Sequence, residues 1–159
     1  MRDIDKEKLT EELKLAQQKI ADLETALIGD KQIKSLSEYV FRSFAESATD
    51  SISIWDANLN LVYINEATLK YHPAGTKKAN VIGKNIKELI PDCEKSGRYE
   101  KYKRVLETGE PLTLDEIKAD AKYGDTCLSL KVFKVDGGIG ILSTDITELP
   151  EKYHLEYTR

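Results

Sequence analysis

The chain has few of the residues from which catalytic and metal centres are usually built. It contains two histidines and two cysteines, and Cys93 and Cys127 lack the close spacing of a zinc site or a disulfide framework. The sequence has no motif typical of a phosphate-binding loop, a zinc protease or a serine hydrolase. We therefore expect no enzyme, no metal site and two reduced thiols. His72 and His154 are expected at the surface rather than as catalytic bases.

The sequence also lacks a long apolar run and an excess of positive charge. No stretch approaches the roughly 18 apolar residues that a membrane-spanning helix requires, and the N-terminus is too charged for a secretory signal. Charged residues make up 33% of the chain, and the formal net charge is -4. A nucleic-acid groove would need a basic stripe. We therefore expect a cytoplasmic protein that binds neither nucleic acid nor membrane.

Residues 1–34 carry the apolar pattern of a coiled coil. Apolar residues recur at alternating spacings of four and three, which places them in one seam along a helix. The pattern predicts a homodimer, parallel or antiparallel, and in a parallel pair Lys19 could meet Glu24 of the other helix. A helix folded back on its own domain is the alternative. The predicted dimer seam consists of Leu9, Leu13, Ile20, Leu23 and Leu27, with Ala16 as a weak layer.

Gly29 and Asp30 are expected to end this helix, because glycine is the common residue just past a helix C-terminus. Apolar residues at helical spacing then predict a second helix over residues 35–47.

Two short β-branched and aromatic runs, Ser51–Trp55 and Leu61–Ile64, flank the polar turn Asp56–Asn60 and predict a β-hairpin. A block of helices is expected next. Its members are a short helix after Asn65 that stops at His72-Pro73, one introduced by residues 81–86 that ends at Pro91, and a longer one that starts at Ser96 and ends before Gly109. Three further strands are predicted at residues 112–118, 127–135 and 139–144, with a turn at residues 121–125.

The order of these elements predicts an α+β fold with a five-stranded antiparallel sheet. A Thr-Asp pair before the first strand, Tyr63-Ile64-Asn65-Glu66-Ala67 after the hairpin, the run from Ile82 to Pro91, and Asp145-Ile146-Thr147 after the last strand resemble a PAS domain. The resemblance covers residues 41–148. It implies short helices over one face of the sheet, and a division into a coiled-coil helix (1–34), a PAS domain (35–148) and a tail or the start of an output helix (149–159).

The resemblance also implies a function in signal transduction. Domains of this family sense a signal and regulate an output domain, such as a histidine kinase in a two-component system. In the family the motif after the last strand joins the PAS domain to its output, so we expect the signal junction at Asp145 and Thr147.

Cofactors used by other PAS domains can be compared with this sequence position by position. Ile86 stands where the adduct-forming cysteine of a light-sensing flavin domain would lie, which argues against covalent flavin chemistry. The helix expected to supply the axial histidine of a haem sensor has none between Arg98 and Glu107, which argues against haem. Non-covalent flavin stays open, because Trp55 and several tyrosines could stack on it; packing of Trp55 in the core or a dimer face is the alternative.

A hollow between the sheet and the helices is the expected place for a small molecule, because aromatic walls with a few hydroxyl and amide groups are typical of such pockets. A packed interior, used for interaction or dimerisation alone, is the alternative. The candidate lining residues are Tyr63, Asn65, Tyr71, Tyr99, Tyr102, Leu130 and Ser143.

Overall fold

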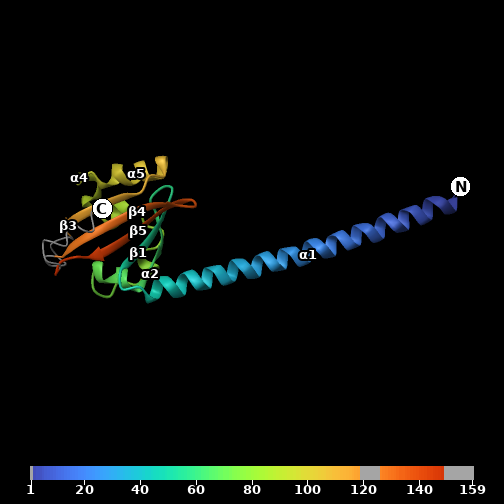
Figure 1. Cartoon of the computed structure of the whole chain (residues 1–159), viewed down its shortest axis with the longest axis horizontal. Helices are drawn as coiled ribbons and strands as arrows, with labels where there is room; N and C mark the ends of the chain where they lie inside the picture. The colour runs from blue at the N-terminus through green and yellow to red at the C-terminus, as the bar shows by residue number, and fades with distance from the viewer. Residues whose placement is uncertain (1, 119–125, 149–159) are drawn as a thin grey trace. The chain divides into compact units, whose positions relative to one another are not determined.

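The computed structural model describes residues 2–118 and 126–148 (Figure 1). They belong to two compact units, one reaching to Ser43 and one starting at Phe44. The predicted turn at residues 121–125 and the tail from residue 149 on, including His154, lie outside the described residues.

The N-terminal residues form a single helix, α1, from Arg2 to Ser47. The prediction that this helix ends at Gly29 and Asp30 is therefore wrong. Gly29 does not adopt the positive φ of a helix-ending glycine. A glycine inside a helix costs only about 1 kcal/mol relative to alanine, and the good helix formers on both sides of Gly29 offset that cost.

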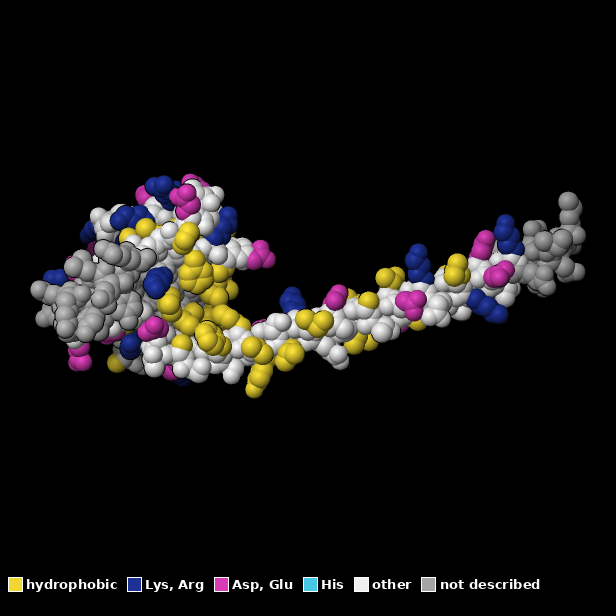
Figure 2. Space-filling view, viewed as in Figure 1, with side chains coloured by type: hydrophobic (Ala, Val, Ile, Leu, Met, Phe, Trp, Pro, Cys, Tyr) yellow, Lys and Arg dark blue, Asp and Glu magenta, His cyan; other side chains and the backbone are white. Residues whose placement is uncertain are grey.

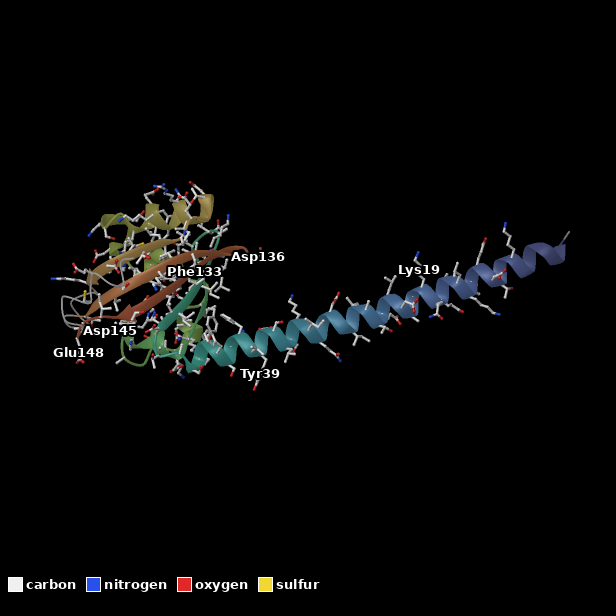
Figure 3. The ribbon with its side chains drawn as sticks, viewed as in Figure 1. Lys19, Tyr39, Phe133, Asp136, Asp145 and Glu148 are labelled. Carbon is white, nitrogen blue, oxygen red and sulfur yellow. The ribbon has the colours of Figure 1, made fainter. Side chains whose placement is uncertain are left out.

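Apolar side chains along α1 are open to solvent in the single chain. The described members of the predicted seam, Leu13, Ile20, Leu23 and Leu27, are 60%, 56%, 64% and 56% exposed. The side chain of Leu9 lies outside the described part of the structure. Hydrophobic side chains occur at intervals along the helix in Figure 2, and Lys19 and Tyr39 extend outward from it in Figure 3.

The second unit is built on a five-stranded antiparallel sheet, which confirms the predicted fold. The strands lie in the order β2-β1-β5-β4-β3, and each pair is antiparallel. The structure places every strand within about two residues of its predicted bounds. The strands are β1 (Ser51–Asp56), β2 (Leu61–Ile64), β3 (Leu112–Lys118), β4 (Cys127–Val135) and β5 (Gly138–Asp145).

Five short helical segments connect β2 to β3. Asn85 caps the start of α3, since its side chain accepts a hydrogen bond from the Lys87 N–H at 3.2 Å. Gly109 ends the last helix with φ 75°, and its N–H donates to the Val105 carbonyl. The segments are η1 (Glu66–Tyr71), α2 (Lys78–Val81), α3 (Ile86–Leu89), α4 (Asp92–Lys95) and α5 (Arg98–Thr108). The sequence did not predict α2 or α4.

The two faces of the sheet differ in what covers them. Trp55, Leu130 and Ile141 project from one face into the hydrophobic core, where they meet Tyr102 and Val105 of α5. The intervening residues of the strands lie on the other face, because successive side chains of a strand point to opposite sides. On that second face Val62 is 54% and Phe133 42% exposed (Figure 3).

Candidate ligand pocket

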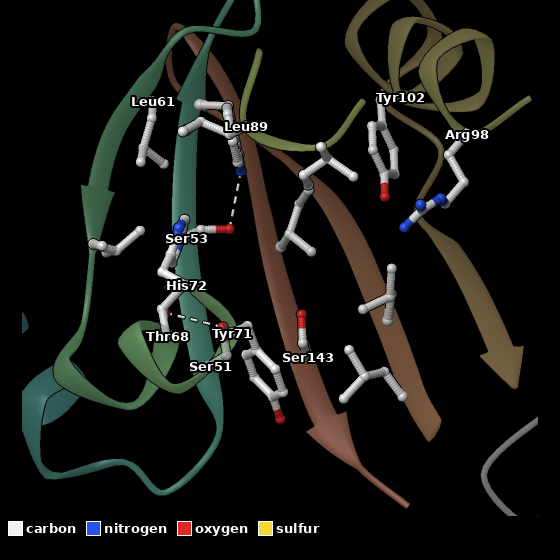
Figure 4. A pocket seen from close by; sticks show the side chains of 16 residues that line it. Ser51, Ser53, Leu61, Thr68, Tyr71, His72, Leu89, Arg98, Tyr102 and Ser143 are labelled. Carbon is white, nitrogen blue, oxygen red and sulfur yellow. Dashed lines mark hydrogen bonds between the residues drawn. The ribbon is translucent and has the colours of Figure 1, made fainter. Parts of the chain in front are cut away.

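A pocket of about 130 Å³ lies between the core face of the sheet and the helical segments (Figure 4). Strands β1, β2, β4 and β5 supply one wall, and η1, α5 and the end of α3 supply the rest. Most of the lining is aliphatic or aromatic, and a few hydroxyl groups, one guanidinium and the imidazole of His72 reach it. His72, predicted at the surface, is thus half-buried beside the pocket. This composition is the usual one for a small-molecule site in a protein.

Hydroxyl groups from β1 and η1 form one side of the pocket. Ser51 and Ser53 share the pocket face with Trp55 because they alternate along β1. The Ser51 hydroxyl donates to the Thr68 hydroxyl at 2.9 Å, and the Trp55 indole N–H donates to the Ser53 hydroxyl at 2.9 Å. These side chains are thus oriented by partners within the protein.

The side chains of Tyr102 and Arg98 form the wall contributed by α5. They are four residues apart and therefore lie on the same face of the helix. Burial raises the pKa of Tyr102 to about 12, and the nearby Arg98 guanidinium opposes that shift. Tyr102 consequently stays protonated at neutral pH and offers a hydroxyl donor to the pocket.

Tyr71 of η1 lines the pocket as well. Its hydroxyl is buried and has no hydrogen-bond partner among the described residues. Burial raises the pKa of Tyr71, and the Lys70 ammonium, 4.9 Å from the centre of the ring, opposes this shift.

The structure brings together four of the seven predicted pocket residues, Tyr71, Tyr102, Leu130 and Ser143. The other three, Tyr63, Asn65 and Tyr99, do not line this pocket. The Tyr63 hydroxyl donates to Glu46 at 2.8 Å. Tyr99 lies beneath the Lys87 ammonium, 4.2 Å from the centre of its ring.

Asn65 is fully buried and joins the last turn of α1 to the sheet. Its amide nitrogen donates to the carbonyl oxygens of Ala45 at 2.9 Å and Asp50 at 2.8 Å. Its amide oxygen accepts from the Ile52 N–H at 2.9 Å and the Thr68 hydroxyl at 2.8 Å. Since Thr68 lines the pocket, Asn65 connects the pocket wall to α1 through two consecutive hydrogen bonds.

Glu46, the next residue of α1, makes a second set of contacts. Its carboxylate accepts from the Tyr63 hydroxyl, the Glu66 N–H and the Lys78 ammonium at 2.8, 2.8 and 2.6 Å. Burial alone would raise the pKa of Glu46, but these hydrogen bonds outweigh it and lower the pKa below its ordinary value of 4.5.

At the predicted signal junction, Asp145 and Thr147 form a compact hydrogen-bonded turn. The Asp145 carboxylate accepts from the Thr147 hydroxyl at 2.6 Å and the Thr147 N–H at 3.0 Å. Burial alone would raise the pKa of Asp145, but these bonds outweigh it and lower the pKa. The Thr147 oxygen also accepts from the Cys127 N–H at 2.9 Å, which anchors the turn to β4.

The described part of the chain has neither a cluster of metal-binding side chains nor a membrane-spanning helix. No group of three histidine, cysteine or carboxylate side chains among the described residues could hold a metal ion. No described helix has a stretch that is both long and apolar enough to cross a membrane.

Residues 39–138 match the sequence model of the PAS fold. The chain belongs to the PAS family. As a PAS domain it is similar to a domain of an HTR-like protein from Haloarcula marismortui, with 17% identity and a TM-score of 0.51 over 63% of this chain and 100% of that one. Among curated proteins, none matches the sequence.

Other PAS domains of known structure share the fold at similar levels. A domain of the sensory box sensor histidine kinase/response regulator from Geobacter sulfurreducens is 20% identical, with a TM-score of 0.55 over 69% of this chain and 94% of that one. The PAS domain of the quorum-sensing receptor RpfR from Cronobacter turicensis, in complex with BDSF, is 24% identical, with a TM-score of 0.50 over 64% of this chain and 97% of that one.

Proposed function

We propose that this chain is a cytoplasmic PAS sensory module that dimerises through α1 and binds a small molecule in the pocket to regulate an output domain such as a histidine kinase. The observation that carries the proposal is the hydrogen-bonded connection between the pocket wall and the last turn of α1. A module that senses needs both a site for the signal and a physical route out of it.

The size of the pocket supports a small ligand. A cavity of about 130 Å³ is close to the roughly 150 Å³ apolar cavity that accommodates benzene in another protein. Drug-sized ligands occupy pockets of about 300–1,000 Å³. We therefore expect a metabolite of about six to nine non-hydrogen atoms rather than a flavin. The PAS domain of RpfR, solved in complex with BDSF, has the same fold.

The hydrogen bonds around Asn65 support a route for the signal. Thr68 and Ser51 both line the pocket, and the Thr68 hydroxyl donates to the Asn65 amide that holds the Ala45 carbonyl. A ligand that competes for the Thr68 hydroxyl would favour one arrangement of these bonds over another. Such a preference shifts the population of α1 packings, which is how a ligand acts on a two-state element.

The exposed apolar stripe of α1 supports dimerisation. Its leucine and isoleucine side chains would bury their surface in a second copy of the helix, and burial of each contributes roughly 1.5–3 kcal/mol. In this arrangement Asp145 and Thr147 are the proposed junction to the output.

A PAS module without a ligand, used only for interaction or dimerisation, is the second candidate. It is favoured by the pocket being smaller than typical ligand sites. Thermal unfolding with a panel of metabolites separates the two candidates, because a compound that binds the folded state raises its stability by RT ln(1 + [L]/Kd).

The panel experiment should include a variant with a filled pocket. Ser143→Leu places a larger side chain in the pocket and should abolish any shift in melting temperature, whereas Thr113→Leu, at an exposed position of β3, should retain it. A panel that shifts neither the original chain nor the Thr113→Leu variant would favour the ligand-free candidate.

A further inference from the structure

The lining of the pocket carries a positively charged side chain and no negatively charged one. Of the sixteen residues that line it, none is an aspartate or glutamate, and Arg98 is the only lysine or arginine. The aliphatic part of the wall includes Leu89, Leu130 and Ile141. The pocket thus combines an apolar body with a single fixed positive charge.

Within the described part of the chain, Arg98 has no acidic partner, unlike Arg42 and Arg104. Arg42 lies 3.1 Å from Glu38, and Arg104 lies 3.7 Å from Glu110. No salt bridge among the described residues includes Arg98, whose Nε donates to the Ser96 hydroxyl at 2.9 Å. A half-buried guanidinium has five N–H donors, and the neighbouring Ser96 and Tyr102 hydroxyls use only part of that capacity.

The polar groups of Arg98, Tyr102 and Ser143 all face the pocket. Figure 4 shows the Arg98 guanidinium beside the Tyr102 hydroxyl, with both directed toward the pocket. Across the pocket, the Ser143 hydroxyl makes no hydrogen bond to the described residues and points into the same space. A guanidinium with donors to spare, beside hydroxyl groups and apolar walls, is the complement of an anion that carries a hydrocarbon group.

We propose that the ligand is a small carboxylate with a short apolar body, its carboxylate bound by Arg98 and Tyr102 and its hydrocarbon part against the leucine and isoleucine side chains. This inference rests on the proposed function and specifies the chemical class of the ligand. A guanidinium binds a carboxylate through two parallel hydrogen bonds, which a neutral ligand does not reproduce.

The test compares acids with their neutral amides on the full chain near neutral pH. The probes are butyrate, isovalerate, hexanoate and benzoate, each paired with the amide of the same skeleton, and binding is measured by thermal shift and isothermal titration calorimetry. We expect at least one acid to bind about tenfold or more tightly than its amide, since a hydrogen bond to a charged group is worth about 1.5–3 kcal/mol.

Two arginine variants locate the charge. Arg98→Met keeps the length of the side chain and should weaken the binding of the acid about tenfold or more while leaving the amide unchanged. Arg98→Lys should recover part of the loss, because the charge remains without the planar fork. Arg104→Gln, an exposed position on the same helix, is the matched control and should bind as the original chain does. Circular dichroism verifies that each variant folds.

The outcomes distinguish the carboxylate assignment from the more general proposal that the pocket binds a ligand. Amides that bind as tightly as their acids, or acids that bind Arg98→Met unchanged, would overturn the carboxylate assignment and leave a ligand-binding pocket in place. An absence of binding by every acid, every amide and the wider metabolite panel would overturn both.

Discussion

Asn65 uses the full hydrogen-bonding capacity of its amide inside the fold, with two donated and two accepted bonds. Asn65→Ala would remove the partner of the Asp50 carbonyl and of the Ile52 N–H, whereas the Ala45 carbonyl would keep its bond from the Ala48 N–H. We expect the free energy of unfolding to fall by about 3 kcal/mol or more, since each unsatisfied buried group costs about 1–3 kcal/mol. Urea unfolding followed by circular dichroism measures the change.

Asn58→Ala is the matched control for this prediction. Asn58 is an exposed residue of the β1–β2 turn, and exposed substitutions change stability by about 0.5 kcal/mol or less. If Asn65→Ala destabilised the protein no more than Asn58→Ala, Asn65 would not be the connection between α1 and the sheet.

Glu46 gives a prediction in the pH dependence of stability. Its carboxylate has a pKa below the ordinary value of 4.5. A lowered pKa in the folded state stabilises the protein above the unfolded-state pKa, and this contribution is lost as the pH falls through the folded-state pKa. Glu46→Gln should therefore be less stable than the original chain at neutral pH, and the difference should shrink as the pH falls below about 4.5.

Urea unfolding at a series of pH values measures this difference. Glu38→Gln is the control: Glu38 pairs with Arg42 on the exposed surface of α1, where ion pairs contribute little. A gap between Glu46→Gln and the original chain that stays constant down to the acid range would contradict the account.

Pocket residues were predictable where the residue type and the periodicity of the helix or strand together indicated that the side chain points toward the interior. Tyr102 was predicted to line the pocket and lies at its wall, and Arg98, four residues earlier on the same helix face, could have been found by the same argument. Asn65 was predicted to line the pocket because an amide is typical of binding sites. The sequence does not reveal that its amide turns instead toward the backbone of residues 45, 50 and 52, since those contacts come from distant parts of the chain.

Between elements, the close approach of β1 and β5 depends on Gly138. A Cβ at this position would lie 1.8 Å from the Trp55 carbonyl oxygen. Gly138→Ala should therefore force the two strands apart and lower the free energy of unfolding by about 3 kcal/mol, a typical cost of a forced backbone shift. Thermal and urea unfolding measure the effect.

Gly29→Ala makes the same substitution where no atom lies within 4 Å of the added Cβ. It should leave the unfolding of the PAS domain unchanged and raise the helical signal slightly, because alanine favours helix by about 1 kcal/mol over glycine. Equal effects of the two substitutions would mean that Gly138 has no special steric role.

The strands were predictable from sequence because runs rich in β-branched, aromatic and other apolar residues are bounded by turn residues, and in β4 they alternate with polar residues at a period of two. Helices α2 and α4 were not, since each has four residues, too few to show a helical period. At Gly29 the sequence predicted a helix end where the structure has none. A glycine at a helix end and one inside a helix look the same in sequence, and the difference lies in the φ angle.

At the scale of the whole molecule, the proposed dimer depends on the apolar stripe of α1. Leu23 is 64% exposed in the single chain, and a coiled-coil partner would cover it. Leu23→Lys would place a charge in that seam in both helices, where burial without a partner is costly. Gln18→Lys is the control, because Gln18 lies off the seam and a lysine there retains Asp22 as its neighbour four residues on.

Dimerisation through α1 is tested by the mass of the full chain in solution, determined by size-exclusion chromatography with light scattering over a range of concentrations. The account predicts a dimer of twice the 18.0 kDa chain mass, retained by Gln18→Lys and shifted to monomer by Leu23→Lys. A chain that stays monomeric at high concentration, or a dimer that Leu23→Lys leaves unchanged, would contradict a sensory module that signals through α1.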